Sequence, residues 1–270
     1  MTEPLTQPFR FGIISFAHLH AAGYARCIQA NPETRLVAIA DENPTRGQEW
    51  AARLNVPYHQ DYRELLARND LDAVIVTTDN IHHAPVTIDA ARAGKHVLCE
   101  KPLVTTVADG RAMIAACDQA GVALGTAFPC RYLPAMSRVK EQIDQGKLGK
   151  VLTIAGTNQG RMPGGWFIER ELSGGGAVMD HTVHVADLIR WLTGAEFAEV
   201  YAESDTLFNP IDIDDAGLLS FSLTDGTICN TARTMSEIAG AGGRSRRLTY
   251  QATSAIASRT NAHGSQAVRR

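Results

Sequence analysis

The first half of the chain alternates short apolar runs with longer amphipathic segments, and this alternation restricts the fold more than any other feature. The runs include FGIIS from residue 11, LVAIA from residue 36, DAVIVTT from residue 72 and HVLCE from residue 96. Runs that are apolar on both faces indicate strands covered from both sides. We therefore predict an α/β fold, with a doubly wound parallel sheet of the Rossmann type over residues 1–128.

After Phe128 the pattern changes. A helical segment, LPAMSRVKEQIDQG, is followed by an apolar run, KVLTIAGTNQ, and by a Gly-rich loop that leads into a second helix. The strand-like segments AEVYAESDTL and GLLSFSLTDGTICNTA come last, and Asp225-Gly226 inside the second is a hairpin signal. Helices followed by strands predict an α+β domain with a mostly antiparallel open sheet over residues 129–235, which serves the substrate and oligomerisation.

Residues 236–270 show neither a strand alternation nor a sustained helical face. The segment holds six arginines, no lysine and one acid. Two explanations stay open: a disordered basic tail, or a chain that left its normal reading frame or lost its natural ending. We expect an irregular basic tail here, outside both domains.

Composition excludes several classes of protein. A net charge of −3 does not indicate a basic surface that would bind nucleic acid or an anionic membrane. No run approaches the ~18 consecutive apolar residues of a spanning helix. Five scattered cysteines without a C-x-x-C pair favour reduced thiols. We expect a cytoplasmic protein that binds a small molecule, with no nucleic-acid or membrane partner.

The turn in GIISFAHLHAAG lies where dinucleotide-binding folds carry G-x-G-x-x-G. Glycines there allow a tight bend and close approach of the backbone to pyrophosphate. Ser15, Ala17 and His20 hold the three glycine positions. Serine and alanine are the smallest substitutes, and Gly12 and Gly23 flank the turn, so a phosphate can still bind at the helix start. His20 either faces the pyrophosphate or is a partly exposed loop residue.

Asp41 follows the second apolar run. An acid at this place accepts a hydrogen bond from a ribose 2′-hydroxyl and repels a 2′-phosphate, which favours NAD over NADP. Two other interpretations stay open: Asp41 caps the helix that begins near Pro44, or Arg46 accommodates a phosphate.

The run GKHVLCEKPLVTT contains the first candidate for catalysis. Its strand, His96 to Glu100, delivers Glu100, Lys101 and Pro102 to the carboxyl edge of the sheet, where open α/β folds bind ligands. A lysine there can hydrogen-bond a substrate hydroxyl and help its proton to leave.

The apolar segment AVMDHTVHVADLIRW (177–191) holds the second candidate. At 100° per residue, Asp180, His184 and Asp187 lie within about 60° of one another on a helix, while His181 lies about 100° from Asp180. Buried charges must be paired or functional. The i, i+4 spacing lets Asp180 and His184 act together.

Two other interpretations of these histidines stay open. In one, His181, His184 and Asp180 bind zinc, although H-x-x-H is not the H-E-x-x-H motif of a metalloprotease. Such a site predicts a metal-dependent sugar isomerase or hydrolase and stoichiometric metal after purification. In the other, the histidines satisfy a helix cap or a neighbouring carboxylate. We assign no residue as a metal ligand.

Six segments taken together resemble the Gfo/Idh/MocA oxidoreductase family, named for glucose-fructose oxidoreductase and inositol dehydrogenase. They are GIISFAHLH, VTTDNIHH, AGKHVLCEKPL, FPCRYLPA, GKLGKVL and GGGAVMDHTVHVADLIRWLTG. The resemblance extends from about Phe9 to Thr231. It implies a Rossmann domain, a C-terminal open-sheet domain and reversible oxidation of a sugar or cyclitol hydroxyl by a nicotinamide.

The resemblance also implies roles for single residues. Lys101 resembles the family's catalytic lysine, and Asp180 and His184 resemble its aspartate and histidine. His184 would take the hydroxyl proton, with Asp180 orienting it and Lys101 polarising the oxygen. Asn80 and His83 match a loop that the family writes as T-P-N-x-x-H, with an aspartate in place of the proline.

Two sets of binding residues complete this prediction. We expect the cofactor to contact Gly12, Ser15, Ala17, His18, Leu19, His20, Asp41, Thr78, Asn80, His83, Glu100 and Lys101. We expect the substrate to contact Arg131, Asn158, Trp166 and His181. Trp166 either offers a face to a sugar ring or serves in packing.

The sequence therefore predicts an NAD(P)-dependent dehydrogenase of a sugar or cyclitol, with NAD as the cofactor and NADP as the alternative. The competing hypothesis is a catalytically silent nicotinamide-binding protein, because the turn lacks glycines and the C-terminal segment is unusual. A homo-oligomer is expected if the C-terminal sheet is intact.

Overall fold

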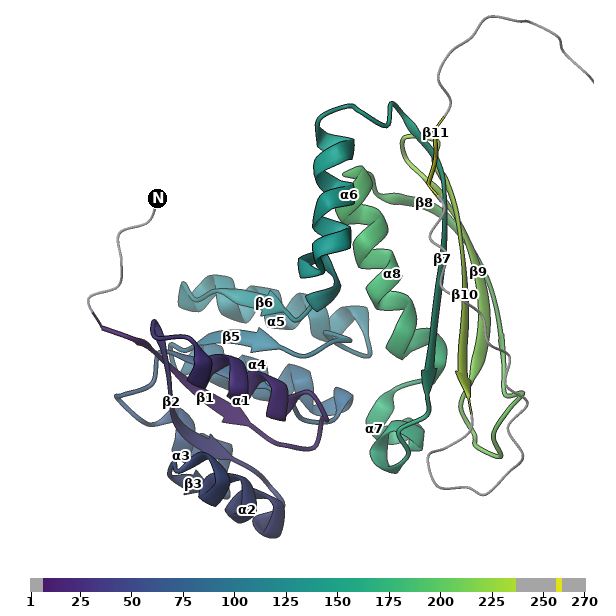
Figure 1. Ribbon diagram of the computed structural model, residues 1–270. Helices are drawn as coiled ribbons and strands as arrows, with labels where there is room; N and C mark the ends of the chain where they lie inside the picture. Colours follow the sequence, from purple (N-terminus) through teal and green to yellow (C-terminus); the bar gives the residue numbers. More distant parts are fainter. Residues whose placement is uncertain (1–6, 237–255, 259–270) are drawn as a thin grey trace, which may run out of the picture. The chain divides into compact units, whose positions relative to one another are not determined.

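The computed structural model describes residues 7–236 and 256–258, in which the chain forms two compact units (Figure 1). The first unit contains the described residues up to Ala127 together with Gly165–Gly175. The second contains Phe128–Gly164 and the described residues from Gly176 onward. The segment 165–175, which the sequence pattern placed in the second domain, therefore clusters with the first unit.

The first unit is built on a six-stranded sheet in the order β3-β2-β1-β4-β5-β6, with every pair parallel. The strands are β1 (Phe9–Ile14), β2 (Thr34–Ala40), β3 (Tyr58–His59), β4 (Ala73–Val76), β5 (His96–Cys99) and β6 (Leu124–Thr126). The strand order reverses between β1 and β4, which is the point where such sheets bind nucleotides. The predicted doubly wound parallel sheet is confirmed.

Helices connect these strands. They are α1 (Ala21–Ala30), α2 (Pro44–Leu54), α3 (Tyr62–Leu66), η1 (Asn80–His82), α4 (His83–Arg92), α5 (Val107–Ala120), η3 (Gly165–Ile168) and α7 (Arg170–Ser173). Local sequence explains several of their ends: Thr106 accepts a hydrogen bond from the amide of Asp109 at 3.1 Å, and Gly121 follows α5 with φ 66°. These are the usual N-cap and left-handed C-terminal arrangements.

Neighbouring residues of the central strands point into two different apolar clusters. Ile13 and Ile75 belong to one cluster, while Ile14 and Val76, the next residue in each strand, belong to the other. Side chains alternate between the two faces of a strand. Both faces of the sheet are therefore buried, which is why these runs have no polar alternation.

The second unit has a five-stranded sheet in the order β11-β7-β10-β9-β8. Its elements are η2 (Pro129–Tyr132), α6 (Pro134–Asp144), β7 (Val151–Arg161), α8 (Ala177–Thr193), β8 (Phe197–Asp205), β9 (Ala216–Leu223), β10 (Ile228–Ser236) and β11 (Ile256–Ser258). The pair β10 and β7 is parallel, and the other pairs are antiparallel. The predicted mostly antiparallel sheet is confirmed, and α6 and α8 lie on one side of it (Figure 1).

Two glycines of β7 let α8 lie close to the sheet. A Cβ atom at Gly156 would lie 2.9 Å from Val185 Cγ1, and one at Gly160 would lie 2.7 Å from His181 Cε1. The apolar core of this unit forms between the same two elements and includes Ile154 and Ile189. Contact with α8 therefore depends on small residues in the strand.

The C-terminal segment differs in part from expectation. Residues 256–258 form β11, which pairs antiparallel with β7, although no strand was predicted after Ser236. The isolated sequence IAS has no alternation long enough to be recognised, and its pairing partner lies about a hundred residues earlier in the chain. The rest of the predicted basic tail, 237–255 and 259–270, lies outside the described residues.

Among the described residues no helix meets the length and apolarity that a membrane span requires.

An ion pair joins the start of β1 to the residue before β4. The Asp72 carboxylate accepts hydrogen bonds from the backbone amide of Arg10 at 2.8 Å and from its Nε at 2.9 Å. The hydrogen bond with Arg10 lowers the pKa of Asp72. Because the folded-state pKa is the lower one, this stabilisation is present above the unfolded-state pKa, near 4, and is lost as the pH falls through the folded-state value.

We expect Asp72→Asn to lower the free energy of unfolding by about 1–2 kcal/mol at pH 7, because charge-assisted hydrogen bonds are lost. Urea unfolding at pH 7 and at pH 3 measures the difference, which should shrink at the lower pH. Glu49→Gln removes an exposed partner 4.0 Å from Arg53 and serves as the control, with an expected change below about 0.5 kcal/mol. An equal cost of Asp72→Asn at both pH values would contradict this account.

Candidate functional site

The turn after β1 takes the conformation that a glycine-rich turn would take. Ser15, at the first glycine position, has φ 70° in the left-handed region, which costs a non-glycine residue roughly 1–2 kcal/mol. Two hydrogen bonds offset this cost: Thr77 Oγ1 donates to the Ser15 carbonyl at 2.6 Å, and the Ala17 amide donates to Ser15 Oγ at 3.1 Å. The missing glycine therefore does not prevent the bend.

Asp41 is buried and holds this turn. Its carboxylate accepts hydrogen bonds from the amides of Phe16 at 2.7 Å and Asn43 at 2.9 Å, and from Arg46 Nε at 2.8 Å. The N-cap of α2 is Asn43, so the interpretation of Asp41 as that cap is wrong. Arg46 also donates from Nη2 to Glu42 at 2.6 Å, so both acids after β2 engage the same guanidinium.

A cleft of about 150 Å³ opens at the carboxyl ends of β1, β2 and β4. Its lining residues are Ile14, Ala40, Asp41, Glu42, Gln60, Tyr62, Thr78, Asp79, His82 and Val86. It lies where the strand order reverses, and carboxylates after β2 are the groups that accept hydrogen bonds from ribose hydroxyls. The residues present therefore fit the adenosine part of a nicotinamide dinucleotide.

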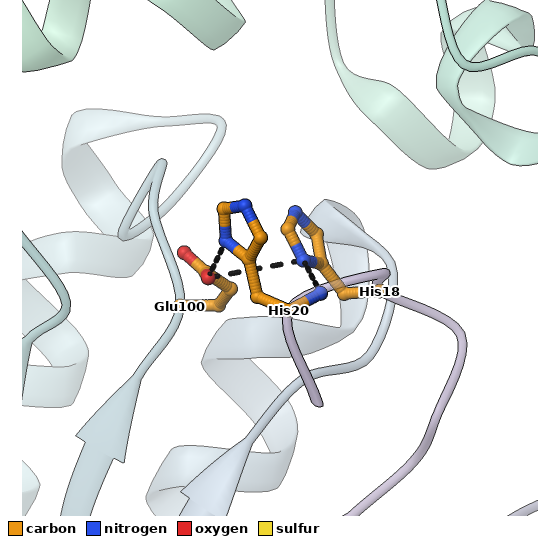
Figure 2. Close-up of side chains that lie close together, drawn as sticks. All are labelled: His18, His20 and Glu100. Carbon is orange, nitrogen blue, oxygen red and sulfur yellow. Dashed lines mark hydrogen bonds and ion pairs between the residues drawn. The ribbon is translucent and has the colours of Figure 1, made fainter. Parts of the chain in front are cut away.

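The predicted residues His18, His20 and Glu100 lie together beside this turn, as Figure 2 shows. His20 Nδ1 lies 2.5 Å from Glu100 Oε1, and His18 Nδ1 lies 3.8 Å from the same oxygen. Tyr24 donates its hydroxyl to this oxygen at 2.7 Å, and the Lys101 amide donates to Oε2 at 2.5 Å. Both interpretations of His20 were incomplete, because the imidazole binds a carboxylate while 40% of its side chain stays exposed.

The carboxyl group of Glu100 is fully buried and ionised. Burial alone would raise its pKa, but the hydrogen bond from His20 and the nearby imidazoles outweigh burial and lower the pKa to about 2. Burial and the same carboxylate raise the pKa of Tyr24. The end of β5 therefore presents an anion to two histidines from the β1–α1 turn.

Two other predicted cofactor residues have structural partners. Asn80 is buried and donates from Nδ2 to the Ser173 carbonyl at 2.8 Å. His83 is buried, its Nδ1 lies 2.9 Å from the Pro102 carbonyl, and desolvation lowers its pKa. His83 thus supports the turn that carries Lys101. The structure does not bring Gly12 to the turn after β1, because Gly12 lies inside β1 against leucine side chains, where a Cβ would have contacts of 3.1 Å.

In the second unit, α8 carries the predicted catalytic pair. Asp180 Oδ2 lies 3.3 Å from His181 Nε2, so this carboxylate and this imidazole are neighbours although they lie about 100° apart around the helix. His184 Nδ1 lies 3.8 Å from Cys130 Sγ, and its ring meets Phe128 edge to face. Sequence reasoning missed Cys130, because no local pattern links residues that are this far apart in the chain.

The N-terminus of α8 is capped from a distant loop. Asp214 accepts hydrogen bonds at its carboxylate from the amides of Gly176 at 3.1 Å and Val178 at 2.7 Å, and at its carbonyl from Ala177 at 2.8 Å. A negative charge at a helix start is favourable. These bonds place Asp180 and the histidines of the first turns, although no motif marks Asp214.

Two predicted substrate residues have other partners. Arg131 Nε donates to the buried carboxylate of Asp187 at 2.7 Å, which neutralises that charge. Trp166 Nε1 donates to the Ala17 carbonyl at 3.2 Å, and its ring stacks on Phe167 with centroids 3.8 Å apart. The packing alternative for Trp166 therefore has direct support. Asn158 lies on β7 between Gly156 and Gly160, on the side that faces α8.

The side chains of His, Cys, Asp and Glu can bind metal ions. Among the described residues, His18, His20 and Glu100 form the one group of three such side chains whose ligand atoms all lie within 4.8 Å of one another. The predicted alternative of Asp180, His181 and His184 does not form such a group there.

The strand order and the cleft at its reversal define the first unit as a dinucleotide-binding Rossmann domain. A family model described as an oxidoreductase family with an NAD-binding Rossmann fold matches residues 9–128, and the GFO/IDH/MocA C-terminal domain matches residues 136–258. The chain belongs to the Gfo/Idh/MocA oxidoreductase family.

Individual relatives agree with this assignment. The chain is 41% identical to 1,5-anhydro-D-fructose reductase of Ensifer adhaerens, over 63% of this chain and 52% of that protein. It is 31% identical to myo-inositol 2-dehydrogenase of Thermotoga maritima, over 77% of this chain and 61% of that protein. The chain thus spans between half and two thirds of the length of these curated relatives.

A solved structure supports the fold. The WlbA dehydrogenase of Bordetella pertussis, in complex with NADH and UDP-GlcNAcA, matches with a TM-score of 0.79 and 29% identity, over 86% of this chain and 68% of that chain.

Proposed function

We propose that the protein is an NAD(P)-dependent oxidoreductase that transfers hydride between a nicotinamide and a hydroxyl-bearing carbon of a sugar or cyclitol. The observation that carries this proposal is the position of Lys101. It is 4% exposed and follows β5 at the carboxyl edge of an NAD-binding sheet, next to a carboxylate that binds the turn after β1. The names of the relatives support a sugar or cyclitol as the substrate class.

The proposed division of labour assigns the cofactor to residues 1–128 and the substrate to residues 129–235. A bound nicotinamide would supply the hydride acceptor for the carbon that carries the hydroxyl. Lys101 donates a hydrogen bond to the hydroxyl oxygen, and His184 accepts the hydroxyl proton as a general base. Asp180 and His181, whose Oδ2 and Nε2 lie 3.3 Å apart on α8, orient the base and the substrate.

The proposed substrate contacts follow from the surface of the second unit. His181 and Asn158 lie on facing elements, α8 and β7, and offer an imidazole and an amide to neighbouring hydroxyls. Arg131 would act by holding Asp187, and Trp166 by its packing against Ala17. A polyhydroxylated ring suits such a set, because an amide donates and accepts hydrogen bonds.

The direct test is a substrate panel. The full chain is incubated with NAD or NADP and with aldoses, anhydrosugars and cyclitols, and the absorbance of the reduced nicotinamide is followed. We expect reduction with at least one class and none with simple primary alcohols. NADH binding without turnover of any sugar or cyclitol would overturn the proposal and support a catalytically silent protein.

We expect Glu42→Gln to raise the affinity for NADPH about fivefold and to change NADH affinity little. The 2′-phosphate of NADPH would lie near Glu42, and one like-charge repulsion across water costs about 1 kcal/mol at 4 Å. The change also releases Arg46 Nη2 from this acid. Fluorescence titration with both nucleotides measures the ratio, and Glu49→Gln in the following helix, α2, is the control. An unchanged ratio would place the ribose elsewhere.

We further propose a homo-oligomer formed through the sheet of the second unit. The strands β8 and β9 expose Tyr201 at 58% and Leu218 at 50% on the same face of the sheet, and exposed apolar groups that gather on one face mark interaction sites. Light scattering is expected to give a mass above that of one chain, and Leu218→Lys is expected to lower it. A monomer at all micromolar concentrations would contradict the proposal.

We also place the protein in the cytoplasm. The five cysteines are free thiols in the structure, which suits a reducing compartment. Fractionation of cells that produce the protein, followed by detection of the chain, tests this placement.

A further inference from the structure

His18, His20 and Glu100, which were predicted as cofactor contacts, form a cluster that takes no part in the proposed hydride and proton transfers. The two imidazoles come from the β1–α1 turn, and the carboxylate comes from the residue after β5, eighty positions later. In Figure 2 one nitrogen of each ring faces the same carboxylate oxygen. Two neutral imidazoles and one carboxylate are a donor set that transition metals bind.

We propose that His18, His20 and Glu100 bind a divalent transition metal ion of the zinc class. The ligand atoms are His18 Nδ1, His20 Nδ1 and Glu100 Oε1. These three residues are other than those of the H-x-x-H segment of α8, and metal binding to them can be measured without turnover.

All three ligand atoms lie within 4.8 Å of one another, and the two separations that involve Glu100 need only small shifts to suit a metal ion. Ligand atoms about 2.1 Å from a tetrahedral zinc ion lie about 3.4 Å apart. The separation between Glu100 Oε1 and His18 Nδ1 is 3.8 Å, and that between Glu100 Oε1 and His20 Nδ1 is 2.5 Å. The first must shorten and the second lengthen by less than about 1 Å. Because 40% of the His20 side chain is exposed, an ion can enter from that side and move this ring outward.

The hydrogen bonding of His18 suits a metal ligand. Its Nδ1 accepts a hydrogen bond from the His20 amide at 3.2 Å, so this nitrogen carries a lone pair and no proton. A metal ion would take the place of the amide hydrogen at this lone pair.

The surroundings of Glu100 hold it as a ligand. The Lys101 amide donates to Oε2 at 2.5 Å, which leaves Oε1 toward the two rings. Tyr24 donates to Oε1 at 2.7 Å and restricts its rotation. Hydrogen bonds of this kind orient metal ligands and raise affinity. Three protein ligands also leave one position open for water or another oxygen, as in catalytic zinc sites.

The test uses the full chain, purified without a histidine tag and dialysed against a chelator. Titration with Co²⁺ is followed by visible absorption, and titration with Zn²⁺ by calorimetry. We expect one ion per chain, a tetrahedral or five-coordinate Co²⁺ spectrum and a rise in Tm on addition of Zn²⁺. His20→Ala is expected to weaken binding at least tenfold.

His59→Ala is the matched control, because His59 in β3 also lies beside one carboxylate, Glu64 at 3.4 Å, but in no group of three ligands. Its metal affinity should equal that of the unmodified chain. Glu100→Gln keeps the side-chain volume and provides a second variant if His20→Ala loses stability. Equal Co²⁺ binding by His20→Ala and the unmodified chain, or no binding at millimolar Co²⁺, would overturn the proposal.

Discussion

Replacing His184 with alanine is expected to lower kcat by about 10²- to 10⁴-fold, which is the usual contribution of a general base. The dissociation constant for NADH should change less than about threefold, because His184 belongs to α8 of the second unit and the cofactor cleft is formed by first-unit residues. Stopped-flow turnover with the substrate found in the panel measures the first quantity, and fluorescence titration measures the second.

Added imidazole provides a sharper test of the role of His184. It should restore part of the rate of His184→Ala, because a small base can occupy the space that the side chain leaves. His59→Ala is the matched control and should keep the unmodified rate, since His59 lies in β3 beside Glu64 and belongs to neither candidate group. A fall in NADH affinity that accounts for the whole loss of activity would remove His184 from proton transfer.

Lys101→Met removes the other proposed contact to the hydroxyl while keeping an unbranched side chain. The same loss of kcat is expected as for His184→Ala, and the double variant should be little slower than either single one, because groups that act in one step are not additive. Additive losses would show that the two residues serve different steps.

Gly176→Ala is expected to destabilise the second unit by about 3 kcal/mol or more. A Cβ atom at this position would lie 1.8 Å from the Asp214 carbonyl oxygen and 2.7 Å from its carbonyl carbon. These are backbone atoms, and they are held by the hydrogen bonds that cap α8. The clash can be relieved only if the cap opens, so the cost combines strain with lost hydrogen bonds.

Thermal and urea unfolding measure this effect. Gly23→Ala is the matched control, because a Cβ there has nothing within 4 Å and the residue lies inside α1. It should stabilise the chain by about 0.5–1 kcal/mol through helix propensity. A Gly176→Ala chain with unchanged unfolding would show that the Asp214 loop moves freely.

The sequence predicted the parts of the site that depend on regular periodicity. The apolar runs located the strands, so the place of Lys101 at the end of β5 followed from counting along one segment. The helical spacing of Asp180 and His184 was equally local. Both predictions depend only on the regular geometry of a single strand or helix.

The partners of these residues could not be predicted in the same way. Nothing near Asp41 shows that its carboxylate holds the Phe16 amide rather than capping α2, and nothing near Arg131 marks Asp187 as its ion-pair partner. Tyr24, which donates its hydroxyl to Glu100, was likewise not predicted from the sequence.

By itself, the sequence determined the two kinds of sheet, the order of their elements and the turn that replaces glycine with serine, because these depend on backbone preferences and on burial repeated every two or four residues. Only the tertiary structure decided that His18 and His20 share one carboxylate, that Asp214 caps α8 and that residues 165–175 cluster with the first unit. Such contacts join positions tens of residues apart, and their energy arises from charge and hydrogen-bond geometry that no local pattern records.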